Sequence, residues 1–202
     1  MTPQQTQSGD YLVLEKDAAE VEDNLMRLVS AHWDYIDRFA SQLVARGPLL
    51  SSDGQSHMGS VHIITSASFL DAQRFAKEEP YYQANLYSSV TVTRFRNLLR
   101  QTMWERAPSV PPECSTFILA NWPIRSCTAK QIEQLQTAGL ANRSWVFLGL
   151  LLSTDDKCIG IAAAADLKPE AAESSLRELL ELSELYSDSI ELSRWQRGGR
   201  QK

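Results

Sequence analysis

The sequence predicts an α+β protein made of two tandem βαββαβ units, each of about a hundred residues, the size of one small domain. The first observation is an internal echo, because Gly47–Asp53 resembles Gly149–Asp155 and Leu86–Ser88 resembles Leu185–Ser187. The second is that strand-like and helix-like hydrophobic patterns follow the same order in both halves. The third is a proline-rich connector at residues 106–113, which can form neither a helix nor a central strand.

The first half begins with a strand and a helix. Tyr11–Leu14 is a short apolar run that ends at charged residues, which is typical of a buried strand. Between Val21 and Leu43 the apolar residues recur at spacings of three and four, or multiples of them, and this predicts an amphipathic helix. His32 follows Leu28 by four residues and precedes Ile36 by four, so it lies on the apolar stripe of that helix.

Three more strands and a second helix complete the first half. Gly47–Pro48 ends the helical region and Leu49–Leu50 starts the second strand. Val61–Thr65 is the third strand, and Ser68–Lys77 is a helix with Ser68 as its N-cap. Val90–Thr93 alternates apolar and polar side chains, as a half-exposed strand does. The resulting order is the ferredoxin-like split arrangement.

The second half repeats this order. Thr128 and Gln131 have the spacing of a capping box, which predicts the start of its first helix. Pro169 opens the second helix, at a position where proline is tolerated. The four strands are predicted at Phe117–Leu119, Trp145–Leu152, Ile159–Ala165 and Ser189–Trp195.

The composition narrows the functional classes. The net charge is -5 with both signs interspersed, which argues against a nucleic-acid surface, because such a surface needs clustered Lys and Arg. No apolar run is long enough to cross a bilayer, and the N-terminus lacks the charged and apolar regions of a signal peptide. We therefore predict a cytoplasmic protein that binds neither nucleic acid nor membranes.

Candidate chemistry comes from histidines rather than from cysteines or cofactor motifs. The three cysteines form no Cys-x-x-Cys motif and no Cys/His pair at ligand spacing, so neither disulfides nor zinc is predicted. No P-loop, Rossmann glycine motif or nucleophile elbow occurs, and we predict no cofactor and no metal. His32, His57 and His62 all lie in the first half, His57 in a polar segment predicted as an exposed loop. Any imidazole chemistry therefore belongs to that half.

Six short segments of the first half resemble, in their order and spacing, the YciI-like (YCII-related) family. They are His32 within a helix, Arg46–Leu49, Asp53–Gly54 followed by Gly59–Ser60, Glu79–Tyr81, Leu86–Tyr87 and Arg94–Arg96. The likeness covers residues 10–100, and its specificity comes from the order rather than from any one segment. It implies a ferredoxin-like fold whose units pair through their sheets into a dimeric α/β barrel.

The second half looks like a degenerate copy of the first, with Gln134 near the position of the helix histidine. Because an exposed apolar sheet face favours aggregation, we predict that the two units pack sheet to sheet as an intramolecular dimeric α/β barrel. The sequence does not decide whether such tandem-repeat chains are monomers or form homodimers. The predicted segments are a disordered N-terminus at 1–9, a first domain with a pocket at 10–105, a proline-rich linker at 106–113, a degenerate second domain at 114–197 and a tail at 198–202.

The resemblance also implies a pocket between sheet and helices, with a histidine and an acidic residue as its acid/base pair. On this sequence the catalytic residues would be His32 with Glu79 or Asp53. The family commonly has Asp-Pro-Tyr where this chain has Glu-Pro-Tyr, so the carboxylate here reaches one methylene further. The predicted substrate-binding residues are Arg46, Gly47, Pro48, Ser60, Tyr81 and Tyr87.

Each catalytic candidate has a simpler interpretation as well. A histidine on an apolar helix face can be a core residue with one buried partner, an acidic residue before proline is usually solvated, and Asp-Gly is a turn signal. Three functions therefore stay open. In the first, the chain is a small enzyme whose histidine moves a proton on a cyclic or aromatic metabolite, as an isomerase, dehydrohalogenase or other lyase. In the second, it is a non-catalytic small-molecule-binding or accessory protein. In the third, it is a structural interaction protein with a vestigial pocket.

Overall fold

The computed structural model describes residues 8–106, 115–187 and 189–199, and within them it contains eight strands and five helices. The predicted α+β class is confirmed. The chain divides into two compact units, one formed by residues up to Arg94 together with those from Arg197 onward, the other by Phe95–Gln196. The predicted N-terminal segment up to residue 7, the linker from residue 107 to 113 and the tail from residue 200 lie outside the described residues.

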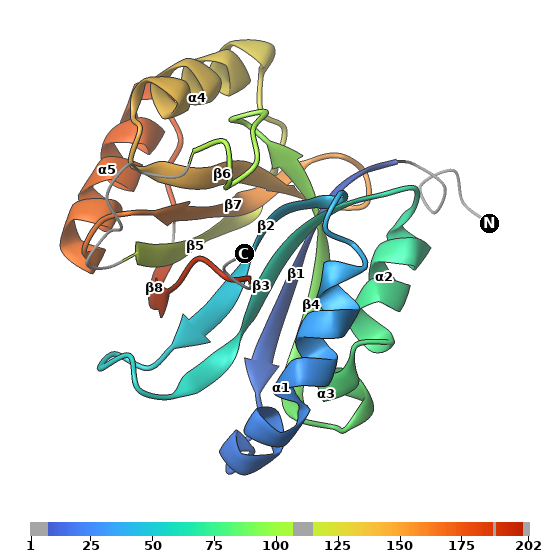
Figure 1. The fold of residues 1–202 in the computed structure, drawn as a ribbon. Coiled ribbons are helices and arrows are strands. Elements are labelled where there is room, and N and C mark those ends of the chain that lie inside the picture. The colour runs from blue at the N-terminus through green and yellow to red at the C-terminus, as the bar shows by residue number, and fades with distance from the viewer. Residues whose placement is uncertain (1–7, 107–114, 188, 200–202) are drawn as a thin grey trace. The chain divides into compact units, whose positions relative to one another are not determined.

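The first unit is a four-stranded arrangement covered by helices (Figure 1). Its strand order is β2-β3-β1-β4, and β3 pairs antiparallel with both β1 and β2. Helices α1, α2 and α3 lie over one face of these strands. Its elements are β1 (Gly9–Asp17), α1 (Glu22–Asp37), β2 (Leu43–Leu50), β3 (His57–Ser66), α2 (Phe69–Lys77), α3 (Pro80–Gln83) and β4 (Tyr87–Asn97).

Alternation along the strands creates the core under these helices. Tyr11 and Val13 of β1 and Ile64 of β3 face the helices, where they meet Ile36 of α1 and Phe75 of α2. All five side chains are at most 2% exposed. Because successive strand residues point to opposite faces, later residues on this side of β1 also lie beneath the helices.

Local signals set the starts of the two shorter helices. The Ser68 side chain accepts a hydrogen bond from the Asp71 amide and caps α2, as the sequence predicts. The short helix α3 was not predicted, and it begins at Pro80 with Glu79 as its N-cap. The Glu79 carboxylate accepts from the Tyr82 amide at 2.9 Å. This cap holds the acidic residue of the candidate site in place.

The prediction for the first helix was too long. Helix α1 ends at Asp37, and Leu43 already belongs to β2. Phe39 and Leu43 nevertheless pack into the same core as the helix, so the apolar spacing continues beyond the helix itself. Pro48, expected to end the helical region, lies inside β2 opposite Ser60 of β3.

The second unit has the strand order β8-β5-β7-β6, with β5 pairing antiparallel with both β7 and β8. The capping box at Thr128 is present at the start of α4, and Pro169 is the first residue of α5, both as predicted. Its elements are β5 (Ser115–Arg125), α4 (Ala129–Ala141), β6 (Trp145–Leu152), β7 (Cys158–Ala165), α5 (Pro169–Leu182) and β8 (Ser189–Trp195).

The boundary between the units lies within β4, before the proline-rich segment. Leu98 and Leu99 are buried in the core of the second unit, and the Leu98 amide donates to the Leu148 carbonyl at 2.9 Å. Near the C-terminus the chain returns to the first unit, because the Gly198 amide donates to the Arg46 carbonyl at 2.9 Å. Part of the segment predicted as a tail therefore borders β2.

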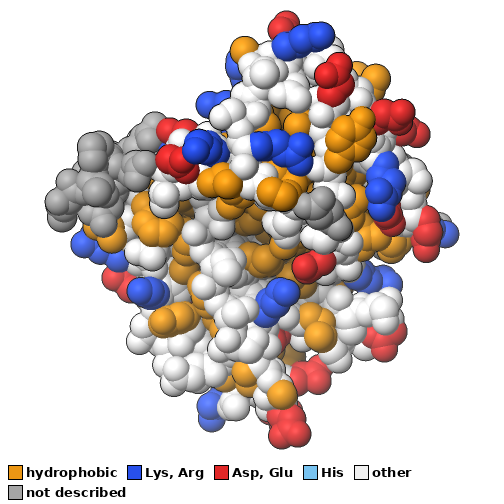
Figure 2. Space-filling view, turned by 180° about the vertical axis from the view of Figure 1, so that it is seen from behind, with side chains coloured by type: hydrophobic (Ala, Val, Ile, Leu, Met, Phe, Trp, Pro, Cys, Tyr) orange, Lys and Arg blue, Asp and Glu red, His pale blue; other side chains and the backbone are white. Residues whose placement is uncertain are grey.

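The surface carries no single block of charge on the face drawn in Figure 2, where Lys and Arg are interspersed with Asp and Glu. Among the described helices none combines the length and the apolarity that crossing a bilayer requires.

Candidate functional site

The first unit contains a cavity of about 150 Å³ in which all three histidines take part in the lining. His32 comes from α1, whereas His57 and His62 come from β3. Five of the six predicted substrate-binding residues also line it, namely Arg46, Gly47, Pro48, Ser60 and Tyr81. The tail residues Gly198 and Gly199 complete the wall beside Arg46, and no sequence pattern indicated them.

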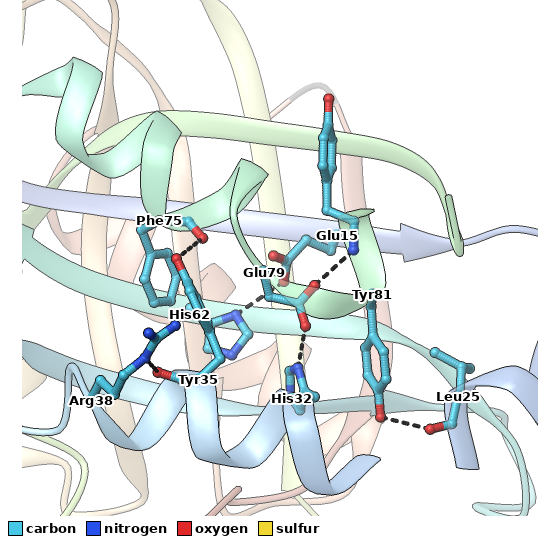
Figure 3. A network of polar contacts seen from close by, with 10 residues as sticks. Glu15, Leu25, His32, Tyr35, Arg38, His62, Phe75, Glu79 and Tyr81 are labelled. Carbon is cyan, nitrogen blue, oxygen red and sulfur yellow. Dashed lines mark hydrogen bonds and ion pairs between the residues drawn. The ribbon is translucent and has the colours of Figure 1, made fainter. Parts of the chain in front are cut away.

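His32 lines the cavity, and behind it Glu79 forms a buried pair with its imidazole (Figure 3). The His32 Nδ1 atom lies 2.5 Å from Glu79 Oε1, and the two residues are 8% and 0% exposed. Burial alone would raise the pKa of Glu79. The hydrogen bond and the charge of His32, with the amides of Tyr82 and Tyr81, outweigh burial and lower it. Glu79 is therefore an ionised acceptor at neutral pH.

The ionised partner determines which nitrogen of His32 carries the proton. Because Glu79 can only accept, the His32 Nδ1 atom carries the proton and donates it. In the neutral imidazole this leaves the lone pair on Nε2. Tyr81 holds the ring from one side, with a centroid distance of 4.4 Å and an interplanar angle of 2°. The Tyr81 hydroxyl in turn donates to the Leu25 carbonyl at 3.1 Å.

A second histidine–carboxyl pair lies deeper in the same unit. His62 Nδ1 is 3.0 Å from Glu15 Oε2, and both residues are almost fully buried. Burial is the main cause that lowers the pKa of His62 to about 4; the charge of Glu79 opposes this shift, and the charges of Arg46 and His57 contribute to it. Burial, with the charge of Glu79, raises the pKa of Glu15 well above its usual value.

A third pair stands nearer the solvent. His57 Nδ1 is 2.7 Å from Asp17 Oδ2, and the His57 side chain is 25% exposed. His57, which was predicted to lie in an exposed loop, is instead the first residue of β3. The pairing of β3 with β1 brings His57 next to Asp17. Each histidine of the chain thus has its Nδ1 atom on a carboxyl group.

Three predicted site residues do not line the cavity: Glu79, which lies behind His32, Asp53 and Tyr87. Asp53 is in the turn after β2, where its carboxylate accepts from the Ser51 hydroxyl and the Gln55 amide. That position suits the turn interpretation of Asp-Gly. Tyr87 does not line the cavity but contacts the Tyr81 ring edge-on at 6.1 Å between centroids.

The sequence analysis did not identify Glu15 and Asp17. Both fall on the same side of β1 as Tyr11 and Val13, because they continue the same alternation. Their pairing with His62 and His57 depends on the register of β1 against β3, in which Val13 is opposite His62. The sequence signal for these two residues was therefore an acidic side chain at a core-facing position of a strand. Such a signal does not indicate which residue the side chain pairs with.

Arg46 supplies the positive charge beside the cavity. Its Nη1 atom is 2.7 Å from Asp37 Oδ1, which fixes the guanidinium at the end of α1. Within the described residues no group of three or more His, Cys, Asp or Glu side chains has an arrangement that could hold a metal ion.

One comparison with known proteins concerns the first unit. Residues 10–96 match the model of the YCII-related domain, which confirms the resemblance inferred from the sequence. No curated protein matches this chain in sequence. A 5-chloro-2-hydroxyhydroquinone dehydrochlorinase from Burkholderia phenoliruptrix is similar at 22% identity and a TM-score of 0.41, over 43% of this chain and 93% of that chain.

A solved structure of a different protein is similar to nearly the whole chain. A tryptophan variant of chlorite dismutase from Candidatus Nitrospira defluvii aligns with 96% of this chain and 93% of that chain. The identity is 10% and the TM-score 0.57, so the likeness concerns the fold.

Proposed function

We propose that this chain, whose residues 10–96 match the YCII-related domain, uses the cavity of its first unit as a general acid–base site for a small organic molecule. The observation that carries the proposal is that His32, which lines the cavity, is paired with the buried Glu79 carboxylate behind it. A histidine whose Nδ1–H is held by a carboxylate presents a basic Nε2 atom, and the carboxylate stabilises the imidazolium that forms.

The chemical step is a proton abstraction by His32. The Nε2 lone pair takes a hydrogen from an activated carbon, and the electrons of the broken C–H bond move into the substrate. If His32 returns the proton to another atom, the reaction is an isomerisation. If a leaving group departs with its bonding electrons, the reaction is an elimination. A positioned base contributes about 10²–10⁴ in rate, so the substrate must already carry an acidified C–H bond.

The size and lining of the cavity suit a single small ring. A cavity of about 150 Å³ is the size that accommodates benzene in an engineered protein core. Ile36 and the Tyr81 ring supply apolar surface, while Arg46 and Ser60 supply polar groups that would orient the substrate. We therefore assign the substrate class as a small cyclic or aromatic metabolite.

A diverged tandem repeat is part of the same proposal. The two units share the strand order of a ferredoxin-like fold, and the second unit contains no histidine. We propose that the second unit is a copy of the first that kept its core and lost its site. Solution scattering tests the predicted sheet-to-sheet packing within one chain: two separated bodies would contradict it, as would pairing of each half with another chain.

The test of the acid–base role is a thermal-shift screen with phenols, lactones and cyclic ketones, followed by a turnover assay on any scaffold that stabilises the protein. The variant is His32→Gln, and the matched control is Ala31→Gln on the exposed face of the same helix. Loss of turnover with retained ligand binding in His32→Gln supports catalysis. Retained turnover refutes it, and retained ligand binding with no turnover in the parent protein favours the binding-protein alternative.

A further inference from the structure

We propose that Glu15 is protonated and locks His62 in the tautomer with its proton on Nε2, so that His62 offers the cavity a hydrogen-bond donor beside the basic nitrogen of His32. The two rings lie 6.1 Å apart between centroids, and both line the cavity. The part of this inference that concerns the substrate rests on the proposed function of His32. It narrows the substrate to a cyclic carbonyl compound with an acidic hydrogen next to the carbonyl group.

The first step of the argument is the burial of the pair. His62 is 2% exposed and Glu15 0% exposed, and they come from adjacent strands with Val13 opposite His62 in the register. In Figure 3 Glu15 and His62 lie side by side beneath α2, next to Glu79. The charge of Glu79 acts on Glu15, and two ionised carboxylates that interact in a buried site repel each other, so one of the two takes up a proton.

Glu15 is the member of that couple that is neutral. Glu79 is ionised because it accepts from His32 and from the Tyr82 amide. Among the described residues the Glu15 carboxyl group has one hydrogen-bond partner, His62, and its Oε1 atom is buried without one. Burial and Glu79 both raise the pKa of Glu15, whereas the charges of His32 and His57 lower it less. His62 stays neutral as well, because burial disfavours its cation.

The position of the proton on Glu15 decides the tautomer of His62. A proton on Oε1 would leave a buried O–H donor without an acceptor among the described residues. A proton on Oε2 is donated to His62 Nδ1 across the observed 3.0 Å. With Nδ1 accepting, the single proton of the neutral ring must be on Nε2.

The two histidines then play opposite roles. His32 takes the hydrogen from the carbon next to the carbonyl, the C–H electrons form a carbon–carbon double bond, and the carbonyl π electrons move to oxygen. That oxygen becomes an enolate and accepts a hydrogen bond from His62 Nε2–H, without proton transfer. A donor already in place where charge develops stabilises the transition state more than the ground state.

The decisive experiment measures the tautomers directly, in the full chain labelled with ¹⁵N-histidine. Long-range ¹H–¹⁵N correlation spectra distinguish a protonated ring nitrogen from a bare one, and the His32→Gln and His57→Gln variants assign the signals. At neutral pH we expect His62 to carry its proton on Nε2 and His32 to carry its proton on Nδ1. A His62 proton on Nδ1, or a charged His62, overturns the inference and leaves the role of His32 intact. A His32 without a bare Nε2 overturns the proposed function instead.

A binding measurement tests the donor role with 4-nitrophenol, whose planar phenolate resembles an enolate. His62→Gln retains an N–H donor, whereas His62→Leu removes it. We expect His62→Leu to bind 4-nitrophenol with an affinity about tenfold lower than that of His62→Gln, or lower still. Equal affinity of the two folded variants overturns the donor role, and the tautomer spectra of the parent protein remain decisive if either variant does not fold.

Discussion

Replacing Glu79 by Gln tests the central pair of the site with a change of one charge and almost no change of shape. Glu79 is fully buried and uses both oxygens, one on His32 Nδ1 and one on the Tyr82 amide. A Gln side chain has one acceptor oxygen, so it can serve only one of these donors and turns its NH₂ group toward the other. The substitution therefore removes one charge-assisted hydrogen bond and weakens the second.

The expected loss of stability follows from these contacts. Hydrogen bonds to a charged group contribute about 1.5–3 kcal/mol and neutral ones about 0.5–1.5 kcal/mol. Partial relief comes if His32 changes tautomer and accepts from the new amide. We therefore expect Glu79→Gln to lower the free energy of unfolding by about 2 kcal/mol at neutral pH.

The pH dependence of this loss has a defined sign. The folded-state pKa of Glu79 lies below its unfolded value, so its contribution is complete above the unfolded pKa and is lost as pH falls through the folded one. The difference between parent and variant should therefore shrink below about pH 4. Urea unfolding followed by circular dichroism, at neutral pH and in acid, measures both values.

Glu78→Gln is the matched control, because Glu78 is the exposed neighbour of Glu79. Its effect should stay within about 0.5 kcal/mol at either pH. A cost of Glu79→Gln as small as that of the control would refute the charged pair. A cost that does not decrease in acid would refute the ionised state of Glu79.

Three further substitutions test the packing around the site and in the second unit. Gly59 has φ +149°, and a Cβ atom there would clash with the backbone oxygen of Glu15 in β1, so Gly59→Ala should prevent stable folding. Gly9→Ala is the control and should be tolerated, because the space around Gly9 is open. Arg106 donates to the Trp145 and Asn142 carbonyls, so Arg106→Gln should cost about 2–4 kcal/mol in urea unfolding. Tyr81→Phe keeps the ring stacked on a histidine but loses its buried hydrogen bond, which should cost about 1 kcal/mol.

Each of these predictions has an outcome that contradicts it. A Gly59→Ala protein with the thermal stability of Gly9→Ala would mean that β3 does not approach β1 as described. Arg106→Gln should be compared with Arg177→Gln, whose ion pair with Glu173 is exposed; equal costs would rule out a structural role for the buried guanidinium. An unchanged melting temperature in Tyr81→Phe would show that its hydroxyl bond contributes nothing.

Local features of the fold were predictable because they depend on residues close together in the chain. Ser68 and Thr128 cap helices three residues from the amides they bind, and such short-range signals are visible in a single sequence. The end of α1 was harder to predict, because Phe39 and Leu43 lie outside the helix but contribute to the same core. Periodicity shows which side chains are buried but does not show whether the backbone stays helical.

The site divides in the same way. The sequence by itself determined that imidazole chemistry could occur only in the first half, and the family resemblance left Glu79 and Asp53 as the two candidate carboxylates for His32. Only the tertiary structure decided that Glu15 meets His62 and that Asp17 meets His57. The physical reason is that these partners lie on different strands, and a shift of the register by one residue would turn their side chains to the other face.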